Sequence, residues 1–284
     1  MRAHSDKHLN VLIDLWLDED IGDGDHTTLS TIPADAYGKA KLLAKQEGII
    51  AGVRIAVEIF KRFDPGLKTN ILIPDGSPIK PGDIVFEVNG LVRTILQTER
   101  LVLNVMQRMS GVATQTHNYV QKLDGLKTKI LDTRKTAPGM RLLEKEAVKL
   151  GGGENHRIGL YDMILIKDNH IDFAGGITNA LQWTRKYLDE NKKDLKIVIE
   201  ARSLNDIREI LANGGADRIL IDNFTPALTR EAVALVAGAC QTESSGGITL
   251  ENIREFAESG VDYISVGALT HQIKSLDLSL KAAF

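Results

Sequence analysis

Hydrophobic and polar positions alternate in short stretches along the chain up to about Leu91. A strand-like run covers residues 40–50, and two further apolar runs, at 71–76 and 81–90, contain Asp-Gly, Pro-Gly or Asn-Gly turn signals. Between these runs, residues 52–63 carry apolar side chains at helical spacing. This mixture predicts a small α+β domain with an antiparallel sheet, and a two-sheet sandwich is the alternative.

One long amphipathic helix is expected next, from Thr94 to Val120. Thr94 followed by Gln97 has the form of a capping box, and apolar residues recur at helical spacing behind them. The helix also has a polar stripe, formed by Arg100, Asn104, Gln107 and Arg108. On periodicity alone this stripe is interpreted as a solvated face.

The rest of the chain alternates between short apolar runs and helical segments. The runs lie at 129–131, 163–166, 195–199, 218–221, 239–243 and 263–266. Near-continuous apolar runs are typical of parallel strands buried on both faces. Glu200, Asp222 and Ser244 follow one another at intervals of 22 residues, and Gly267 comes 23 residues later. This period is that of a repeated strand–helix unit, which forms either a doubly wound sheet or a barrel, and six units are visible.

Composition narrows the class of protein. Of 284 residues, 43% are hydrophobic and 26% charged, which indicates a globular chain with ample surface to bury. No apolar run is long enough for a transmembrane helix, and no secretory signal is visible at the start. The single cysteine, Cys240, excludes an intrachain disulfide and favours a reducing compartment, with the cytoplasm as the expectation. The net charge of −3 gives no reason to expect nucleic acid or membrane as a partner.

Cationic side chains gather where the predicted strands end. Arg134 and Lys135 follow one run, Lys167 follows the next, and the intervening loop carries His156 and Arg157. Because ligands of parallel α/β folds bind at the carboxyl ends of strands, these groups are expected to meet around one anion. A single strand-end charge would indicate only contact with solvent, but the whole set is hard to explain in that way.

Two acids and two glycine-containing turns complete the candidate site. Glu200 and Asp222 end neighbouring strands, so they suit Mg²⁺, sugar hydroxyls or a developing positive charge. Alternatively, each pairs only with a neighbouring cation. The segments Ser245-Gly246-Gly247 and Ser265-Val266-Gly267 come before helices in the last two units, where barrels often bind phosphate.

Other binding signatures are missing from the sequence. It has no Walker loop, and the glycines at 151–153 lack the spacing of a dinucleotide-binding loop. The segment Asp23-Gly24-Asp25 resembles a calcium loop but lacks the closing glutamate, so it is interpreted as a turn or cap.

Four segments together resemble the quinolinate phosphoribosyltransferase family. They are Ile130–Thr136, Gly151–Arg157, Ile166–His170 and Glu243–Ile248. The resemblance implies an N-terminal α/β (α+β) sandwich domain, here residues 1–115, that covers the partner's active site. It also implies a six-stranded α/β barrel, residues 116–284, whose extreme C-terminus is a candidate to return to the first domain. The implied assembly is a homodimer in which Arg100 reaches the neighbouring subunit's site, and this replaces the interpretation of a solvated stripe.

The resemblance also implies roles for the candidate residues. Quinolinate would be bound by Arg100, Arg134, His156 and Arg157, with Lys135, Lys167 and His271 helping to bind the dicarboxylate or the departing pyrophosphate. Glu200 and Asp222 would hold Mg²⁺, directly or through water, or the ribose hydroxyls. The 5′-phosphate would bind Ser245, Gly246, Gly247, Ser265 and Gly267, while Thr133 and Val266 complete the substrate-binding set. Lys135, Lys167, Glu200 and Asp222 are the catalytic candidates.

The implied reaction joins quinolinate to phosphoribosyl pyrophosphate and releases CO₂ and pyrophosphate, giving nicotinate mononucleotide for NAD synthesis. Two other enzymes remain possible on the residues alone. One is a related phosphoribosyltransferase with a different acceptor. The other is a Schiff-base aldolase that uses Lys167 as its amine. A barrel that binds an anion without catalysis is the third alternative.

Overall fold

The structure is a computed structural model that describes residues 2–283, with side chains from Lys7 onward. Its contacts group the chain into two compact units. Unit 1 contains the chain up to His117, Ala137–Gly152 and the chain from Gln272, and unit 2 contains Asn118–Thr136 and Gly153–His271. The domain boundary expected between residues 115 and 116 concerns independent folding and stays a prediction.

Unit 1 is an α+β unit built on an antiparallel sheet of strand order β12-β1-β5-β3. Its strands are β1 (Tyr37–Ala44), β2 (Gly48–Ile49), β3 (Lys68–Ile71), β4 (Pro78–Ile79), β5 (Ile84–Leu91) and β12 (Leu278–Ala283), of which β2 and β4 form a separate pair. Its helices are α1 (Arg2–Ile21), α2 (His26–Thr31), α3 (Val53–Phe63), α5 (Arg141–Leu150) and most of α4 (Val92–Lys122). Helix α3 packs on the sheet through Phe60, whose ring meets that of Phe86 edge to face at 5.9 Å. The two-sheet sandwich is therefore wrong.

Helix α4 is held by buried polar contacts as well as by its apolar face. The Ser110 hydroxyl accepts a hydrogen bond from the Ala51 amide (2.9 Å) and donates to the Ala51 carbonyl (3.1 Å). Gln107 donates from Nε2 to the carbonyl of Leu278. A Cβ on Gly111 would overlap the backbone of Lys274, so only glycine allows the C-terminal segment to approach this closely.

Several local expectations for unit 1 need correction. Helix α4 begins at Val92, and the Thr94 hydroxyl donates to Asp64 inside the first turn, so Thr94 is not an N-cap. Strand β3 ends at Ile71, where the sequence had predicted a strand to begin. Neither α1 nor α5 was predicted. The cap expected near Asp25 is confirmed, because its carboxylate accepts a hydrogen bond from the Thr28 amide at the start of α2.

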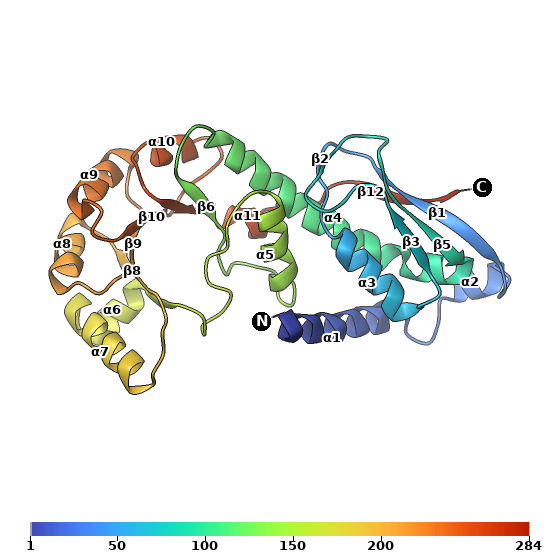
Figure 1. The fold of residues 1–284 in the computed structure, drawn as a ribbon, viewed down its shortest axis with the longest axis horizontal. Helices are drawn as coiled ribbons and strands as arrows, with labels where there is room; N and C mark the ends of the chain where they lie inside the picture. The colour runs from blue at the N-terminus through green and yellow to red at the C-terminus, as the bar shows by residue number, and fades with distance from the viewer. Residues whose placement is uncertain (1, 284) are drawn as a thin grey trace. The chain divides into compact units, whose positions relative to one another are not determined.

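Unit 2 is a parallel α/β sheet of six strands in the order β6-β11-β10-β9-β8-β7, and helices α7 to α10 lie along its outer side (Figure 1). The strands are β6 (Lys129–Leu131), β7 (Ile164–Ile166), β8 (Ile197–Ala201), β9 (Arg218–Asp222), β10 (Gln241–Ser245) and β11 (Tyr263–Ser265). The helices are α6 (Asp168–Ala174), α7 (Ile177–Glu190), α8 (Leu204–Asn213), α9 (Pro226–Val236), α10 (Ile253–Ala257) and α11 (Ala268–His271). The predicted set of six parallel strands is confirmed.

The edge of β6 is covered by a loop. Glu154 makes an isolated parallel bridge with Leu131, in which its amide donates to the Ile130 carbonyl and its carbonyl accepts from the Asp132 amide. This pairing places the segment that carries His156 and Arg157 against the end of β6.

The buried serine of α4 provides a test of the packing in unit 1. We expect Ser110→Ala to lower the free energy of unfolding by about 1–3 kcal/mol, because it leaves the buried Ala51 amide without an acceptor. Ser30→Ala removes an equivalent hydroxyl from an exposed position and should change the stability by less than about 0.5 kcal/mol. Chemical denaturation of both variants measures the difference, and equal stabilities would contradict this account.

Candidate active site

The register of the parallel strands places the candidate residues on one face. Side chains alternate between faces along a strand, and partners in register point the same way. Glu200 and Glu243 are both in register with Leu220, and Ser245 is in register with Asp222, two residues further along β9. Glu200, Asp222 and Ser245 therefore share one face, which the contacts of Glu243 described below identify as the inner face.

The two acids have different surroundings. Glu200 is 7% exposed, lies 3.3 Å from Lys167 Nζ through Oε1 and accepts the Asp168 amide at 2.9 Å through Oε2. Asp222, the last residue of β9, accepts a hydrogen bond from the side chain of Asn223 (2.7 Å). Burial, and then the charge of Glu200, raise the pKa of Asp222, although Lys167 and Asn223 act in the opposite direction. A cation near both acids would relieve this repulsion.

Arg157 lies near both Arg134 and Glu200. Burial, followed by the charge of Arg134, lowers the pKa of Arg157, against the opposing influence of Asp162 and Glu200. The Arg157 guanidinium donates to the Met163 carbonyl, but the Nε atoms of Arg134 and Arg157 are both buried without a hydrogen-bond partner in the described part of the chain. Since buried donors are normally paired, two neighbouring guanidinium groups that each have an unpaired Nε suit an anionic ligand.

His156, the residue before Arg157, is held by contacts within unit 2. Its ring is buried, Nδ1 accepts a hydrogen bond from the Arg157 amide (2.8 Å), and Nε2 lies 3.2 Å from Oε2 of Glu243. Nε2 has no hydrogen-bond partner among the described residues, so its contact with Glu243 is electrostatic. The His156 amide donates to the buried carboxylate of Asp132. His156 thus faces the interior of the unit.

Lys135 and His271 meet at the end of β11. A Cβ built on Gly267 would lie 3.0 Å from Lys135 Cδ and 3.0 Å from His271 Nε2. The Lys135 amide donates to the Thr133 hydroxyl, and its carbonyl accepts from Thr270. These contacts join the end of β6 to the end of β11 and leave both side chains exposed.

The two glycine-containing turns differ in what they offer. Gly246 and Gly247 have φ of 93° and 62°, in the left-handed region, and a Cβ on Gly246 would overlap the side chain of Asn223. By contrast, Val266 is buried and its amide already donates to Leu131 in β6. Ser265 is 7% exposed at the end of β11. Of the two turns, Ser245-Gly246-Gly247 is therefore the one whose backbone a ligand can approach more easily.

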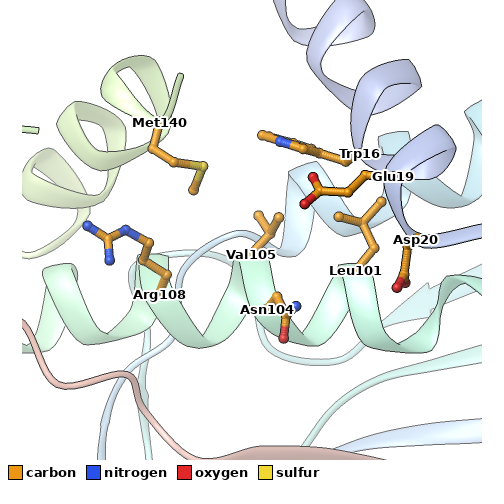
Figure 2. A pocket seen from close by; sticks show the side chains of 8 residues that line it. All are labelled: Trp16, Glu19, Asp20, Leu101, Asn104, Val105, Arg108 and Met140. Carbon is orange, nitrogen blue, oxygen red and sulfur yellow. The ribbon is translucent and has the colours of Figure 1, made fainter. Parts of the chain in front are cut away.

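The polar stripe of α4 is only partly solvated. Arg100 is exposed, whereas Arg108 lies 2.7 Å (Nε) from the buried carboxylate of Glu144. Asn104 and Arg108 line a cavity of about 300 Å³ together with Trp16 and other residues of α1 and α4 (Figure 2). Arg100 belongs to unit 1, so the structure does not group it with the strand-end residues of unit 2.

Sequence reasoning missed three buried residues of this region. Asp132 lies two positions before Arg134, which is a signal that could have been used. Glu243 is the last residue of the predicted run 239–243, and Ser244 follows it. No periodicity distinguishes these two residues from apolar strand positions. The structure shows both as fully buried, and the Ser244 hydroxyl has no partner among the described residues.

The donor set fits a loosely held divalent cation rather than a closed metal cage. Among the described residues, no group of three or more His, Cys, Asp or Glu side chains could hold a metal ion. Two carboxylates alone are what Mg²⁺ uses when substrate phosphates and water supply its remaining ligands. Glu200 and Asp222 are such a pair.

Comparison with known proteins identifies relatives over nearly the whole chain. Residues 25–110 match the family described as quinolinate phosphoribosyl transferase, N-terminal domain, and residues 112–281 match its C-terminal domain. A chloroplastic nicotinate-nucleotide pyrophosphorylase (carboxylating) from Oryza sativa subsp. japonica is 44% identical over 294 aligned residues, which cover 98% of this chain and 79% of the relative. A probable nicotinate-nucleotide pyrophosphorylase (carboxylating) from Bacillus subtilis (strain 168) is 43% identical, covering 96% and 92%. The crystal structure of NadC from Streptococcus pyogenes has a TM-score of 0.92 and 36% identity, covering 97% of each chain.

The raised pKa of Asp222 predicts an unusual dependence of stability on pH. A carboxyl with a raised pKa in the folded state stabilises the fold at low pH and loses that contribution as the pH rises through its folded pKa. We therefore expect Asp222→Asn to raise the melting temperature at pH 7.5, with a gain that shrinks as the pH falls toward 4. In Asp172→Asn the sign should reverse, because a hydrogen bond from Arg202 lowers the pKa of Asp172. Melting curves across this pH range test both signs, and a loss of stability in Asp222→Asn at pH 7.5 would contradict the assignment.

Proposed function

Because this chain belongs to the quinolinate phosphoribosyltransferase family, we propose that it transfers the phosphoribosyl group of phosphoribosyl pyrophosphate to quinolinate. The products are nicotinate mononucleotide, CO₂ and pyrophosphate, in the synthesis of NAD. The observation that carries the proposal is the gathering of Arg134, Arg157 and Lys167 opposite Glu200 and Asp222 at the carboxyl ends of the strands.

The cationic side chains are proposed to hold quinolinate. Its two carboxylates suit guanidinium groups, which bind a planar carboxylate through two parallel hydrogen bonds. The unpaired Nε atoms of Arg134 and Arg157 support this role. Lys135, Lys167 and His271 carry the exposed cationic or polar ends that are proposed to contact the second carboxylate or the pyrophosphate.

The acids are proposed to act on the sugar. Glu200 and Asp222 would bind the ribose hydroxyls or Mg²⁺, directly or through water, and their negative charge favours the positive charge that develops at the anomeric carbon. When bound, Mg²⁺ would neutralise charge on the leaving pyrophosphate. Glu200 also keeps Lys167 in place through the 3.3 Å ion pair.

The serine and glycine residues at the ends of β10 and β11 are proposed to hold the 5′-phosphate. The left-handed φ of Gly246 and Gly247 and the absence of their side chains let backbone amides approach a ligand. Ser245 and Ser265 lie on the inner face and supply hydroxyl donors, and Gly267 leaves room beside Lys135.

The chemical steps need no general base for the attack. The lone pair of the pyridine nitrogen forms a bond to the anomeric carbon, while the bond to pyrophosphate breaks and its electron pair leaves with the pyrophosphate. The ring nitrogen is then positively charged, so it stabilises the electron pair left on the adjacent carbon when CO₂ departs, and a proton replaces the carboxylate there. The surrounding guanidinium groups favour both the bound dicarboxylate and the developing negative charge.

We propose a homodimer as the working assembly, with Arg100 completing the neighbouring subunit's site. The exposed position of Arg100 on α4, free of partners among the described residues, supports this role. No helix within residues 2–283 combines the length and the apolar character needed to span a membrane. The compartment is proposed to be the cytoplasm on the ground of the single cysteine, whereas the rice relative is named chloroplastic.

One assay tests the proposed function. Purified protein with quinolinate, phosphoribosyl pyrophosphate and Mg²⁺ should release CO₂ and form nicotinate mononucleotide, and chelation of the metal should stop turnover. Efficient replacement of quinolinate by nicotinate would show that the acceptor is different. Borohydride trapping of a substrate on Lys167 would instead establish Schiff-base chemistry, although the ion pair with Glu200 favours a binding role for this lysine.

The arginine next to β6 gives the first prediction for activity. We expect Arg134→Ala to lower kcat/KM for quinolinate by about 100-fold or more while the fold is retained, because a preorganised charge is lost. Arg254→Ala, which removes a surface arginine paired with Glu258, is the matched control and should leave kcat/KM within about 2-fold. Steady-state kinetics and circular dichroism measure the two effects. Turnover close to wild type in Arg134→Ala would show that the cationic cluster is not the site.

Mixed dimers test the shared site. Arg100→Ala and Arg134→Ala should each be nearly inactive, but a random mixture of the two should regain about a quarter of wild-type activity, because half of its dimers contain one intact site. A mixture of Arg134→Ala and Arg157→Ala should regain no activity. Both residues lie in unit 2, so each site of a mixed dimer carries one of the two changes. Activity of refolded mixtures measures the recovery. Absence of recovery in the first mixture would argue against the shared site.

A further inference from the structure

The residue that follows Asp222 has an unusual backbone conformation. Asn223 has φ of 57°, in the left-handed region that residues other than glycine rarely adopt. Among the described residues, the other non-glycine residues in this region are Lys192 and Ala237. Both lie just after the ends of helices, α7 and α9, where a left-handed residue is common. Asn223 instead follows strand β9, so the end of a helix does not explain its conformation.

Packing in the core does not explain the conformation of Asn223 either, because the residue is exposed. Asparagine tolerates the left-handed region better than most residues, but glycine adopts it without steric cost. Backbone strain of this kind is concentrated at functional sites, where the surrounding structure maintains it. An exposed asparagine in this conformation, next to a candidate acid, therefore indicates that its side chain has a use.

Three contacts connect Asn223 to both parts of the proposed sugar-phosphate site. Its Nδ2 donates a hydrogen bond to Asp222 Oδ2 at 2.7 Å, and its backbone amide donates to the Ser245 carbonyl at 2.9 Å. Its side chain also fills the space next to Gly246. A Cβ built on Gly246 would lie 2.6 Å from Asn223 Cγ and would overlap Oδ1.

These contacts restrict the acid and the turn together. The hydrogen bond to Oδ2 limits rotation of the Asp222 carboxylate, so it also fixes the direction of the other oxygen. The contact with Gly246 limits movement of the turn that Gly246 and Gly247 form. One side chain thus sets the position of an acid proposed to act on the ribose relative to a turn proposed to bind the 5′-phosphate.

We propose that Asn223 is a positioning residue, which sets the separation of Asp222 from the turn Ser245-Gly246-Gly247 to match that of the ribose and the 5′-phosphate in one phosphoribosyl group. The inference rests on the proposed function for the identity of that group. Quinolinate is assigned to Arg134 and Arg157, which none of the three contacts of Asn223 involves. A change at Asn223 is therefore expected to affect phosphoribosyl pyrophosphate and not quinolinate.

Kinetics separate the side chain of Asn223 from its backbone. Asn223→Gly keeps the left-handed backbone and its amide but removes the side chain. We expect KM for phosphoribosyl pyrophosphate to rise about 10-fold or more, as when a group that orients a ligand-binding residue is lost. KM for quinolinate should stay within about 2-fold. If Asn223 served only to let the backbone turn, glycine would replace it fully. A wild-type KM for phosphoribosyl pyrophosphate in Asn223→Gly would then show that the proposal is wrong.

A second substitution isolates the hydrogen bond to Asp222. Asn223→Asp keeps the size of the side chain, tolerates the left-handed region and retains an oxygen beside Gly246. It replaces the donor of the hydrogen bond with a like charge next to Asp222. We expect KM for phosphoribosyl pyrophosphate to rise in this variant also, and an unchanged KM would count against the proposal.

Lys192 supplies the matched control, because it has φ of 50° and is exposed at the end of α7. Lys192→Gly makes the same kind of replacement in the same backbone region. It should leave both KM values within about 2-fold of wild type. A rise in KM for phosphoribosyl pyrophosphate equal to that in Asn223→Gly would show that the effect is not specific to Asn223, and it would overturn the proposal.

Binding of the product gives a readout that does not need turnover. Nicotinate mononucleotide carries both the ribose and the 5′-phosphate, so calorimetry should show its dissociation constant rising about 10-fold in Asn223→Gly. Wild-type affinity in that variant would contradict the positioning role. If the wild-type protein neither binds nicotinate mononucleotide nor turns over quinolinate, the proposed function itself fails. If the wild-type protein does both and Asn223→Gly matches it, only the role of Asn223 fails.

Discussion

Compensation of buried charge is the constraint on which unit 2 depends. The inner face of its sheet carries ionised side chains, and removing each from water is costly unless an opposite charge or hydrogen-bond donor is close by. Glu243 meets this requirement with Arg218 and His156, and Glu200 meets it with Lys167 and the Asp168 amide. These pairs join β10 to β9 and β8 to the start of α6, so the charges also determine how neighbouring strands and loops are placed.

The carboxyl ends of the strands are different, because there the compensation is incomplete. Arg134 and Arg157 lie near each other with buried and unpaired Nε atoms, and the pKa of Arg157 is lowered by its burial and by its neighbour. Asp222 is in the opposite situation, since burial and then the charge of Glu200 raise its pKa. A ligand set that is anionic toward the arginines and cationic toward the acids satisfies both groups. A dicarboxylate and a sugar that becomes positive during reaction, together with Mg²⁺, have these charges.

The sequence predicted the strands of unit 2 well, and it predicted the site only in part. The run at 129–131 coincides with β6, and the interval of 22 residues correctly paired Glu200 with Asp222. These signals are local or periodic. The contacts of Glu243 could not be predicted, because they depend on the register between strands and on His156, 87 positions earlier. Likewise, the sequence presents His156 only as one more candidate ligand, and the structure adds that its Nδ1 accepts the Arg157 amide and that its Nε2 lies 3.2 Å from Glu243.

Part of the interior of unit 2 is polar, although apolar runs predicted its strands. Arg218, Glu243 and Tyr263 come from three consecutive strands of the sheet order and contact one another. The ion pair of Arg218 Nη1 with Glu243 Oε2, with the Tyr263 ring against the guanidinium, compensates the buried charge, whereas Arg218 Nε and Glu243 Oε1 have no hydrogen-bond partner among the described residues. Glu243 also lies 3.2 Å from His156, whose Nδ1 accepts the Arg157 amide, so this buried carboxylate links the sheet to the loop that carries Arg157.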